Sequence, residues 1–231
     1  MLPICSVSSK NKFRFSWKGV ISMNYRHIVF DVDGTLIDSG TADVRGLQDT
    51  LEQLTGVVTP LEELRFSQGI PGKDTLQILG IEDIDAVEEQ WIQNILRYSG
   101  GITLFPGMKE TLEALDARGV KLGVVTSRTH REFDGDFPRY GVARLFGPMI
   151  CAEDAPGHKP EPAPLLRYME LTGARPEEVL YVGDTINDSL CAQRSGVDFA
   201  LALWGANDLA IPAEHRLQNP SALLDLPDKV L

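Results

Sequence analysis

Short runs of consecutive apolar residues alternate along the chain with stretches in which apolar residues recur every three or four positions. The short runs predict strands buried on both faces of a sheet, and the longer spacing predicts amphipathic helices. The predicted strands are 28–30, 121–126, 149–151, 179–183 and 199–203. Strands that alternate with helices in this way predict an α/β fold with a doubly wound parallel sheet.

Residues 40–101 break this alternation, because they contain only helical patterns punctuated by glycines. One apolar stripe is formed by Val44, Leu47, Leu51 and Leu54, and another by Ile84, Val87, Trp91 and Ile95. We therefore predict a small all-helical domain of about four helices, inserted after the first strand and bounded by Ser-Gly and Gly-Gly pairs. This segment is called the helical insert below. The predicted core comprises residues 23–39 and 102–231.

The first 22 residues differ in composition from the rest, since they hold four basic residues and no acidic one. They lack the apolar run of a secretory signal and only loosely resemble a transit peptide. Because Met23 stands just before the first predicted strand, we interpret 1–22 as a disordered tail or an upstream, misplaced start.

Composition narrows the class of protein. A formal net charge of −11 disfavours a nucleic-acid partner, which requires clustered basic residues, and no apolar stretch is long enough for a membrane span. The three cysteines show no zinc-site spacing and suggest reduced thiols in a cytoplasmic protein. We expect a small-molecule ligand and a monomer or homodimer.

Polar side chains follow four of the predicted strands at the points where they end. These are Asp31 and Asp33, then Thr126 and Ser127, then Lys159, and finally Asp184 with Asp188. In open α/β sheets the ligand site lies beyond the carboxyl ends of the strands, so these side chains are expected to meet at one edge. Residues i and i+2 of a strand share a face, which lets Asp31 and Asp33 converge.

Two carboxylates about 4 Å apart repel each other by roughly 4 kcal/mol at an effective dielectric near 20, so this edge requires a cation or a shared proton. Mg²⁺ fits, because it takes one or two carboxylates and binds substrate phosphate. Lys159 and the backbone amides after Thr126 can then neutralise phosphoryl oxygens. Asp31 suits the role of nucleophile, and Asp33 suits that of general acid and base.

Five segments together resemble the ordered motifs of the haloacid dehalogenase superfamily, with the phosphoglycolate phosphatase-like branch as the nearest match. They are FDVDGTLIDS at 30–39, FPG at 105–107, VVTSR at 124–128, KPEP at 159–162 and VGDTIND at 182–188. The similarity runs from about residue 25 to the end. It implies a Rossmann-like core, with the helical insert as the cap domain of that branch.

The resemblance also implies the role of each matching residue. Asp31 is the nucleophile and Asp33 the general acid and base, while Thr126 and Lys159 hold the phosphoryl group, with Ser127 beside them. Mg²⁺ is bound by Asp31, the carbonyl of Asp33 and Asp184. Asp188 orients either the water shell of the metal or Lys159. The activity implied is hydrolysis of a small phosphorylated metabolite, such as phosphoglycolate or a sugar phosphate, through an aspartyl-phosphate.

Other activities are weighed against this one. A calcium loop needs further acids and a closing Glu that are absent after Gly34, and the phosphonate hydrolases and dehalogenases of the superfamily lack the second Asp. Pyrophosphate hydrolysis, a β-phosphoglucomutase-like phosphotransfer and a catalytically silent phosphate- or partner-binding domain stay open. Lys73, the only lysine of the helical insert, is predicted to contact the non-phosphate end of the substrate, although an exposed loop lysine is an equally good interpretation.

Overall fold

The computed structural model describes residues 25–226 and contains one six-stranded sheet in which every pairing is parallel. The strands lie in the order β3-β2-β1-β4-β5-β6. Their bounds are β1 His27–Phe30, β2 Lys121–Val125, β3 Phe146–Ile150, β4 Val179–Gly183, β5 Asp198–Ala202 and β6 His215–Leu217. The order reverses direction at β1, so the carboxyl end of β1 is the topological switch point at which such sheets bind ligands.

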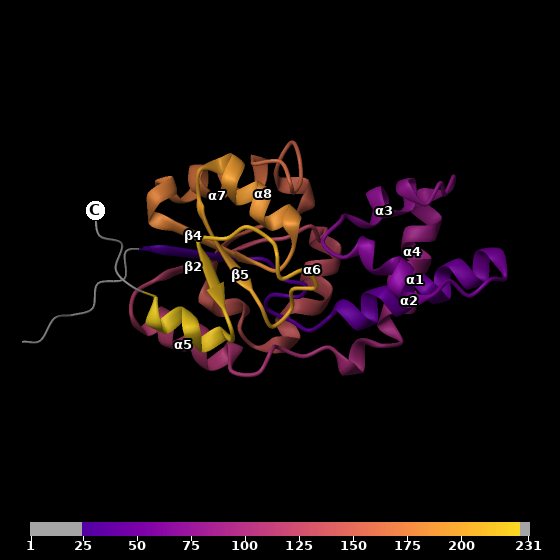
Figure 1. The fold of residues 1–231 in the computed structure, drawn as a ribbon, viewed down its shortest axis with the longest axis horizontal. Coiled ribbons are helices and arrows are strands. Elements are labelled where there is room, and N and C mark those ends of the chain that lie inside the picture. The colour runs from indigo at the N-terminus through magenta and orange to yellow at the C-terminus, as the bar shows by residue number, and fades with distance from the viewer. Residues whose placement is uncertain (1–24, 227–231) are drawn as a thin grey trace, which may run out of the picture.

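Helices cover both faces of the sheet (Figure 1). On one face lie α7 (Ala163–Thr172) and α8 (Ile186–Ser195), and on the other lies α5 (Met108–Ala117). Neighbouring residues of β1 pack to opposite sides, Val29 toward α7 and α8 and Phe30 toward α5. Both faces are therefore apolar, which explains the uninterrupted apolar runs.

The remaining core helix is α6 (His130–Asp136). Short 3-10 segments complete the fold: η1 Arg65–Ser67, η2 Ser99–Gly101, η3 Phe137–Tyr140, η4 Ala143–Leu145, η5 Ala152–Asp154, η6 Pro176–Glu178 and η7 Pro220–Asp225.

The helical insert follows β1 and extends away from the sheet, as Figure 1 shows. Its helices are α1 Gly40–Thr55, α2 Leu61–Leu64, α3 Gly72–Ile78 and α4 Ile84–Leu96. They enclose an apolar cluster of their own, centred on Leu47, Leu76 and Trp91. The two connections to the core run side by side, because the amide of Asp38 donates to the carbonyl of Thr103 (2.9 Å) and that of Phe105 to Leu36 (3.1 Å).

The predicted fold class, a doubly wound parallel α/β sheet, is confirmed, whereas two elements were not predicted. β6 is only three residues long and starts with His215-Arg216, and α6 contains a glycine and several charges, so neither carries an apolar run. β3 also begins three residues earlier than predicted and includes Gly147-Pro148. Proline is tolerated there because β3 is an edge strand.

No helix within residues 25–226 is both long and apolar enough to cross a bilayer. The interpretation of residues 1–22 concerns a segment outside the described part of the chain.

Candidate active site

Asp31 and Asp33 occupy the turn in which β1 leaves the sheet. The amide of Asp31 still donates to Val182 of β4 (2.9 Å), and Gly34 then turns the chain with φ +75°. A side chain on Gly34 would strike the carboxyl group of Asp184, since a Cβ there would lie 2.2 Å from its Oδ2. Glycine at this position therefore serves both the left-handed turn and the approach of Asp184 to β1.

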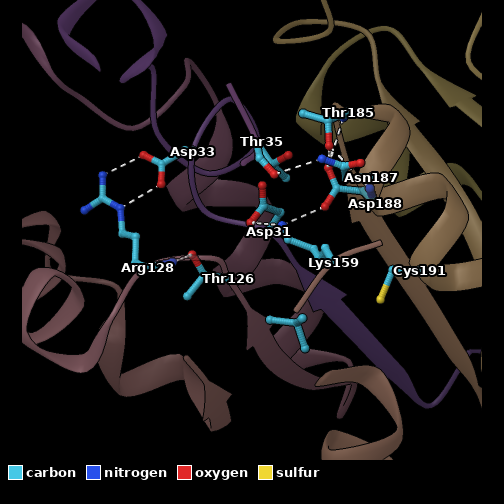
Figure 2. Close-up of polar contacts among 12 residues, drawn as sticks. Asp31, Asp33, Thr35, Thr126, Arg128, Lys159, Thr185, Asn187, Asp188 and Cys191 are labelled. Atoms are coloured by element: carbon cyan, nitrogen blue, oxygen red, sulfur yellow. Dashed lines mark hydrogen bonds and ion pairs between the residues drawn. The ribbon is translucent and has the colours of Figure 1, made fainter. Parts of the chain in front are cut away.

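Lys159 links the end of β1 to the first turn of α8 (Figure 2). Its ammonium lies 2.8 Å from Asp31 Oδ1 and 2.7 Å from Asp188 Oδ1, and the residue is only 2% exposed. Burial opposes a charged lysine, but the carboxylates of Asp188 and Asp31 outweigh it and raise the pKa of Lys159. Lys159 is thus a fixed positive charge beside Asp31.

Asp188 has both carboxylate oxygens occupied by the protein. Oδ1 accepts from the hydroxyl of Tyr181 (3.0 Å) as well as from Lys159, and Oδ2 accepts from the hydroxyl and amide of Thr185 (2.6 and 3.0 Å). Thr185 is the N-cap of α8, so the same contacts start the helix. These contacts favour Asp188 as the residue that orients Lys159 over one that faces the water shell of a metal.

Asp31, Asp184 and Asp188 bring carboxylate oxygens within 4.8 Å of one another. With Lys159 as the cation bound to them, this group carries two uncompensated negative charges if every member is ionised. Burial raises the pKa of Asp31 to about 7 and that of Asp184 well above its usual range, with the charge of Asp188 adding to both. The donor set fits a hard divalent cation, which would supply the missing charge.

Arg128 holds Asp33 from the neighbouring strand end, an interaction that the sequence analysis did not anticipate. Its guanidinium donates to both oxygens of Asp33, with Nε–Oδ2 2.7 Å and Nη2–Oδ1 2.6 Å, and Ser39 donates to Oδ1 (Figure 2). Burial raises the pKa of Asp33, but the Arg128 charge and these bonds prevail and lower it. Asp33 is therefore held as a carboxylate, the form of a general base.

Ser127 carries a buried hydroxyl that has no hydrogen-bond partner among the residues that the structure describes, and it lines the cavity above Asp31. Buried hydroxyls are rarely unpaired, so this one is suited to a polar ligand. Thr126, which is also buried, instead accepts a bond from the amide of Arg128 (3.2 Å) and is not part of the cavity lining.

Lys73 lies apart from these residues. It sits on α3 with a side chain that is 56% exposed, and its ammonium is 2.6 Å from Asp85 and 3.9 Å from Glu88. The predicted contact between Lys73 and a substrate thus requires the lysine to leave Asp85, and it stays a prediction. Below, the strand-end rim denotes the residues gathered at the sheet edge, which are Asp31, Asp33, Ser127, Lys159, Asp184 and Asp188.

The cavity above the strand-end rim is roofed by the helical insert, through the loop 67–72 and one face of α4. Several contacts join the two sides: Arg131 binds Glu89 (2.6 Å), His158 binds Asp74 (2.6 Å), and Asn187 donates to the carbonyl of Gly69 (3.2 Å). These pairs could not be predicted from the sequence, since each joins residues more than 40 positions apart.

An α/β sheet that gathers acids, a lysine and a free hydroxyl at its switch point, beneath an inserted helical roof, defines a class of hydrolytic enzyme. A model of the haloacid dehalogenase-like hydrolase family matches residues 28–202. The chain belongs to this family. The family resemblance predicted from the motifs is confirmed, and so is the prediction of a phosphatase-class enzyme.

The alignments with curated relatives cover most of this chain and most of each relative. Pyrophosphatase PpaX of Oceanobacillus iheyensis is 31% identical over 187 residues, covering 80% of this chain and 87% of the relative. Phosphoglycolate phosphatase of Aquifex aeolicus is 31% identical over 212 residues, covering 88% and 97%. Among solved structures, a Lactobacillus plantarum protein superposes with a TM-score of 0.80 at 29% identity, covering 88% and 99%.

Proposed function

We propose that this protein is a Mg²⁺-dependent phosphatase that hydrolyses small phosphomonoesters through an aspartyl-phosphate on Asp31. The observation that carries the proposal is the buried group of Asp31, Lys159 and Asp184, which adjoins the unpaired hydroxyl of Ser127. Such a group offers a nucleophile, a fixed positive charge for phosphoryl oxygens and oxygen ligands for a cation. The names of the two curated relatives support phosphate-ester or phosphoanhydride hydrolysis.

In the first step, an oxygen of Asp31 attacks phosphorus and the bond from phosphorus to the ester oxygen breaks. Asp33 takes up a proton from solvent as the ester binds and passes it to the departing oxygen, so an alcohol leaves and Asp33 is again a carboxylate. In the second step, Asp33 takes a proton from water, the water oxygen attacks phosphorus, and the bond to Asp31 breaks. The products are inorganic phosphate and the free Asp31 carboxylate, and release of the proton from Asp33 to solvent returns the site to its initial state.

Other residues of the strand-end rim position these groups. Lys159 neutralises a phosphoryl oxygen while Asp188 holds its ammonium in place. Ser127 binds the phosphoryl group, and Thr126, directly after β2, is proposed to support it there. Mg²⁺, held by Asp31, Asp184 and the carbonyl of Asp33, would neutralise charge on the phosphoryl oxygens. Arg128 keeps Asp33 in the ionised form that the second step needs.

Within this proposal, the helical insert is a cap domain that excludes bulk water, and the substrate is a small phosphorylated metabolite. The candidates are of two kinds, a carboxylate-bearing ester such as phosphoglycolate and an uncharged one such as a sugar phosphate. Pyrophosphate is the second candidate, favoured by the name of the Oceanobacillus relative. A β-phosphoglucomutase-like phosphotransfer and a silent binding domain are the remaining alternatives. We also propose that the protein acts in the cytoplasm as a monomer or homodimer, without a nucleic-acid or membrane partner.

The test measures release of p-nitrophenol from p-nitrophenyl phosphate, with Mg²⁺ and then with excess chelator. We expect turnover only with Mg²⁺. Trapping the aspartyl-phosphate by rapid acid quench and locating it on Asp31 by mass spectrometry would establish the covalent route.

A second measurement separates metal binding from catalysis. Mg²⁺ that binds the folded state raises the melting temperature, and Asp184→Asn should remove most of this rise, whereas Asp208→Asn on an exposed loop should retain it. An Asp184→Asn protein with an unchanged Mg²⁺ response would overturn the proposed metal site. Absence of metal-dependent turnover on every ester would favour a silent binding domain.

A further inference from the structure

The face of the cavity opposite the strand-end rim is mainly apolar. The helical insert and its connection contribute Ile70, Trp91, Ile92, Ile95, Leu96 and Ile102 to this lining. The indole N–H of Trp91 donates to the carbonyl of Asp43 (3.1 Å), so its polar atom is occupied. The organic part of a bound ester would therefore meet hydrocarbon surface over much of its length.

The cavity lining also holds acids outside the strand-end rim. Asp43 lies on α1, Glu88 on α4 and Glu132 on α6, and all three line the cavity. Within the described residues, neither Asp43 nor Glu132 has an ion-pair partner within 4 Å. Glu88 pairs only at 3.9 Å with Lys73, whose ammonium is closer to Asp85. Arg128 and Lys73 balance this negative charge only in part, and burial raises the pKa of Asp43 to about 7 and also raises that of Glu88, so these acids carry their full charge above neutral pH.

The two cations of the lining are already committed. Lys159 binds Asp31 and Asp188, and Arg128 binds Asp33 and Asp136. The helical insert contributes no lysine, arginine or histidine to the cavity wall, within the part of the chain that the structure describes. A carboxylate or second phosphate on the substrate would thus find no free cation and would lie near acids whose charge is balanced only in part.

From these observations, and resting on the proposed function, we propose that the cavity selects phosphomonoesters whose organic part is uncharged and partly apolar. It would reject esters that carry a second anionic group there. Phosphoglycolate carries a carboxylate and pyrophosphate a second phosphate, so this chain would discriminate against the substrates for which its curated relatives are named. An uncharged sugar phosphate or a similar ester of a neutral alcohol remains within the selected class.

The test compares kcat/KM for pairs of esters in which one member carries a carboxylate group that the other lacks, using the full chain with Mg²⁺. Ethyl phosphate is paired with phosphoglycolate, and phenyl phosphate with 4-carboxyphenyl phosphate. At pH 8, above the raised pKa of about 7 for Asp43, we expect the neutral member to be favoured by at least about tenfold in both pairs because the acids of the cavity wall repel the carboxylate. The para-carboxylate makes phenolate the better leaving group, so intrinsic reactivity opposes this outcome.

Substitutions in the cavity wall test whether the wall causes the preference for the neutral ester. Glu88→Gln should lower the ratio of kcat/KM for the neutral member to kcat/KM for the carboxylate member by about threefold or more. Leu96→Arg, at a half-exposed position of the cavity lining, should lower this ratio or invert it. Glu52→Gln on the exposed side of α1 and Ile78→Arg on α3 are the matched controls outside the lining, and both should retain the ratio.

Equal or faster hydrolysis of the carboxylate member in both pairs would overturn the inference while leaving the phosphatase proposal intact. A preference that Glu88→Gln and Leu96→Arg leave unchanged would also overturn it, because the acids and apolar wall would then not be its cause. Absence of Mg²⁺-dependent hydrolysis for all four esters would instead overturn the proposed function.

Discussion

The strand-end rim and the helical insert face the same cavity but are built differently. Rim side chains such as Lys159 and Asp188 are nearly inaccessible to solvent, and short bonds to one another fix them at the ends of parallel strands. The insert contributes the hydrophobic side chains of α4 and acids such as Glu88, with few bonds that hold them to the rim. Under the proposed function, the rim carries out the reaction and the insert selects the ester.

Asp31→Asn has the largest expected effect, because it removes the proposed nucleophile while conserving side-chain volume. We expect kcat on p-nitrophenyl phosphate to fall by at least about 1,000-fold. The fold should be retained, since burial already disfavours the charged form of Asp31. Steady-state kinetics and thermal unfolding measure the two effects. Asp134→Asn, an exposed acid on α6, is the control, and a substantial residual rate in Asp31→Asn would contradict the covalent route.

Lys159→Met is expected to lower both the stability and the activity of the protein, unlike a substitution of a surface lysine. The change leaves Asp31 and Asp188 buried without their cation, and breaking a buried ion pair in this way costs about 3 to 5 kcal/mol. Urea unfolding at pH 8 with chelator present measures the free energy, and turnover should be lost with Mg²⁺ present.

The exposed Lys109 on α5 provides the matched control, and Lys109→Met should leave the urea midpoint unchanged. A Lys159→Met protein as stable as the parent would show that the buried pair contributes little to the fold.

The contrast between the two regions also explains what could be predicted from the sequence. Asp31, Lys159 and Asp184 were predictable because parallel strands bring their carboxyl ends to one edge, so position along the chain determines position in space. The same rule placed Arg128 at that edge, but its pairing with Asp33 depends on side-chain direction, which the pattern does not specify.

The residues of the helical insert that line the cavity could not be predicted from their position along the chain. Glu88 stands among other acids on α4, and only the packing of α4 against α1 shows that it faces the cavity while its neighbour Glu89 binds Arg131. Helical periodicity predicted which side of α4 is apolar, but it did not predict that part of this stripe would line a cavity rather than the interior of the insert.

Arg128→Leu is expected to have an intermediate effect, because it changes the protonation of Asp33 rather than removing a reacting group. Arg128 lowers the pKa of Asp33 against the opposing effect of burial. Without it the pKa rises, so Asp33 becomes protonated at higher pH. The acidic limb of the kcat profile should therefore move to higher pH, and kcat at neutral pH should fall about 10- to 100-fold.

Rate profiles between pH 5 and 9 measure this shift, with Arg144→Leu, an exposed residue paired with Glu113, as the control. An acidic limb that stays in place would show that Arg128 does not govern the ionisation of Asp33.

Lys73→Ala has the smallest expected effect and tests the one insert residue that the sequence placed at the substrate. The ammonium of Lys73 pairs with Asp85 of α4, and both side chains are exposed. Exposed ion pairs of this kind contribute little to the free energy of unfolding. We expect KM to change by less than about twofold for neutral and carboxylate-bearing esters alike. Steady-state kinetics on both members of each ester pair measure it, with Lys109→Ala as the control. If Lys73→Ala raised KM severalfold for the carboxylate ester alone, the Lys73 ammonium would contact that carboxylate during turnover. The proposal that the insert offers no cation to the substrate would then be wrong.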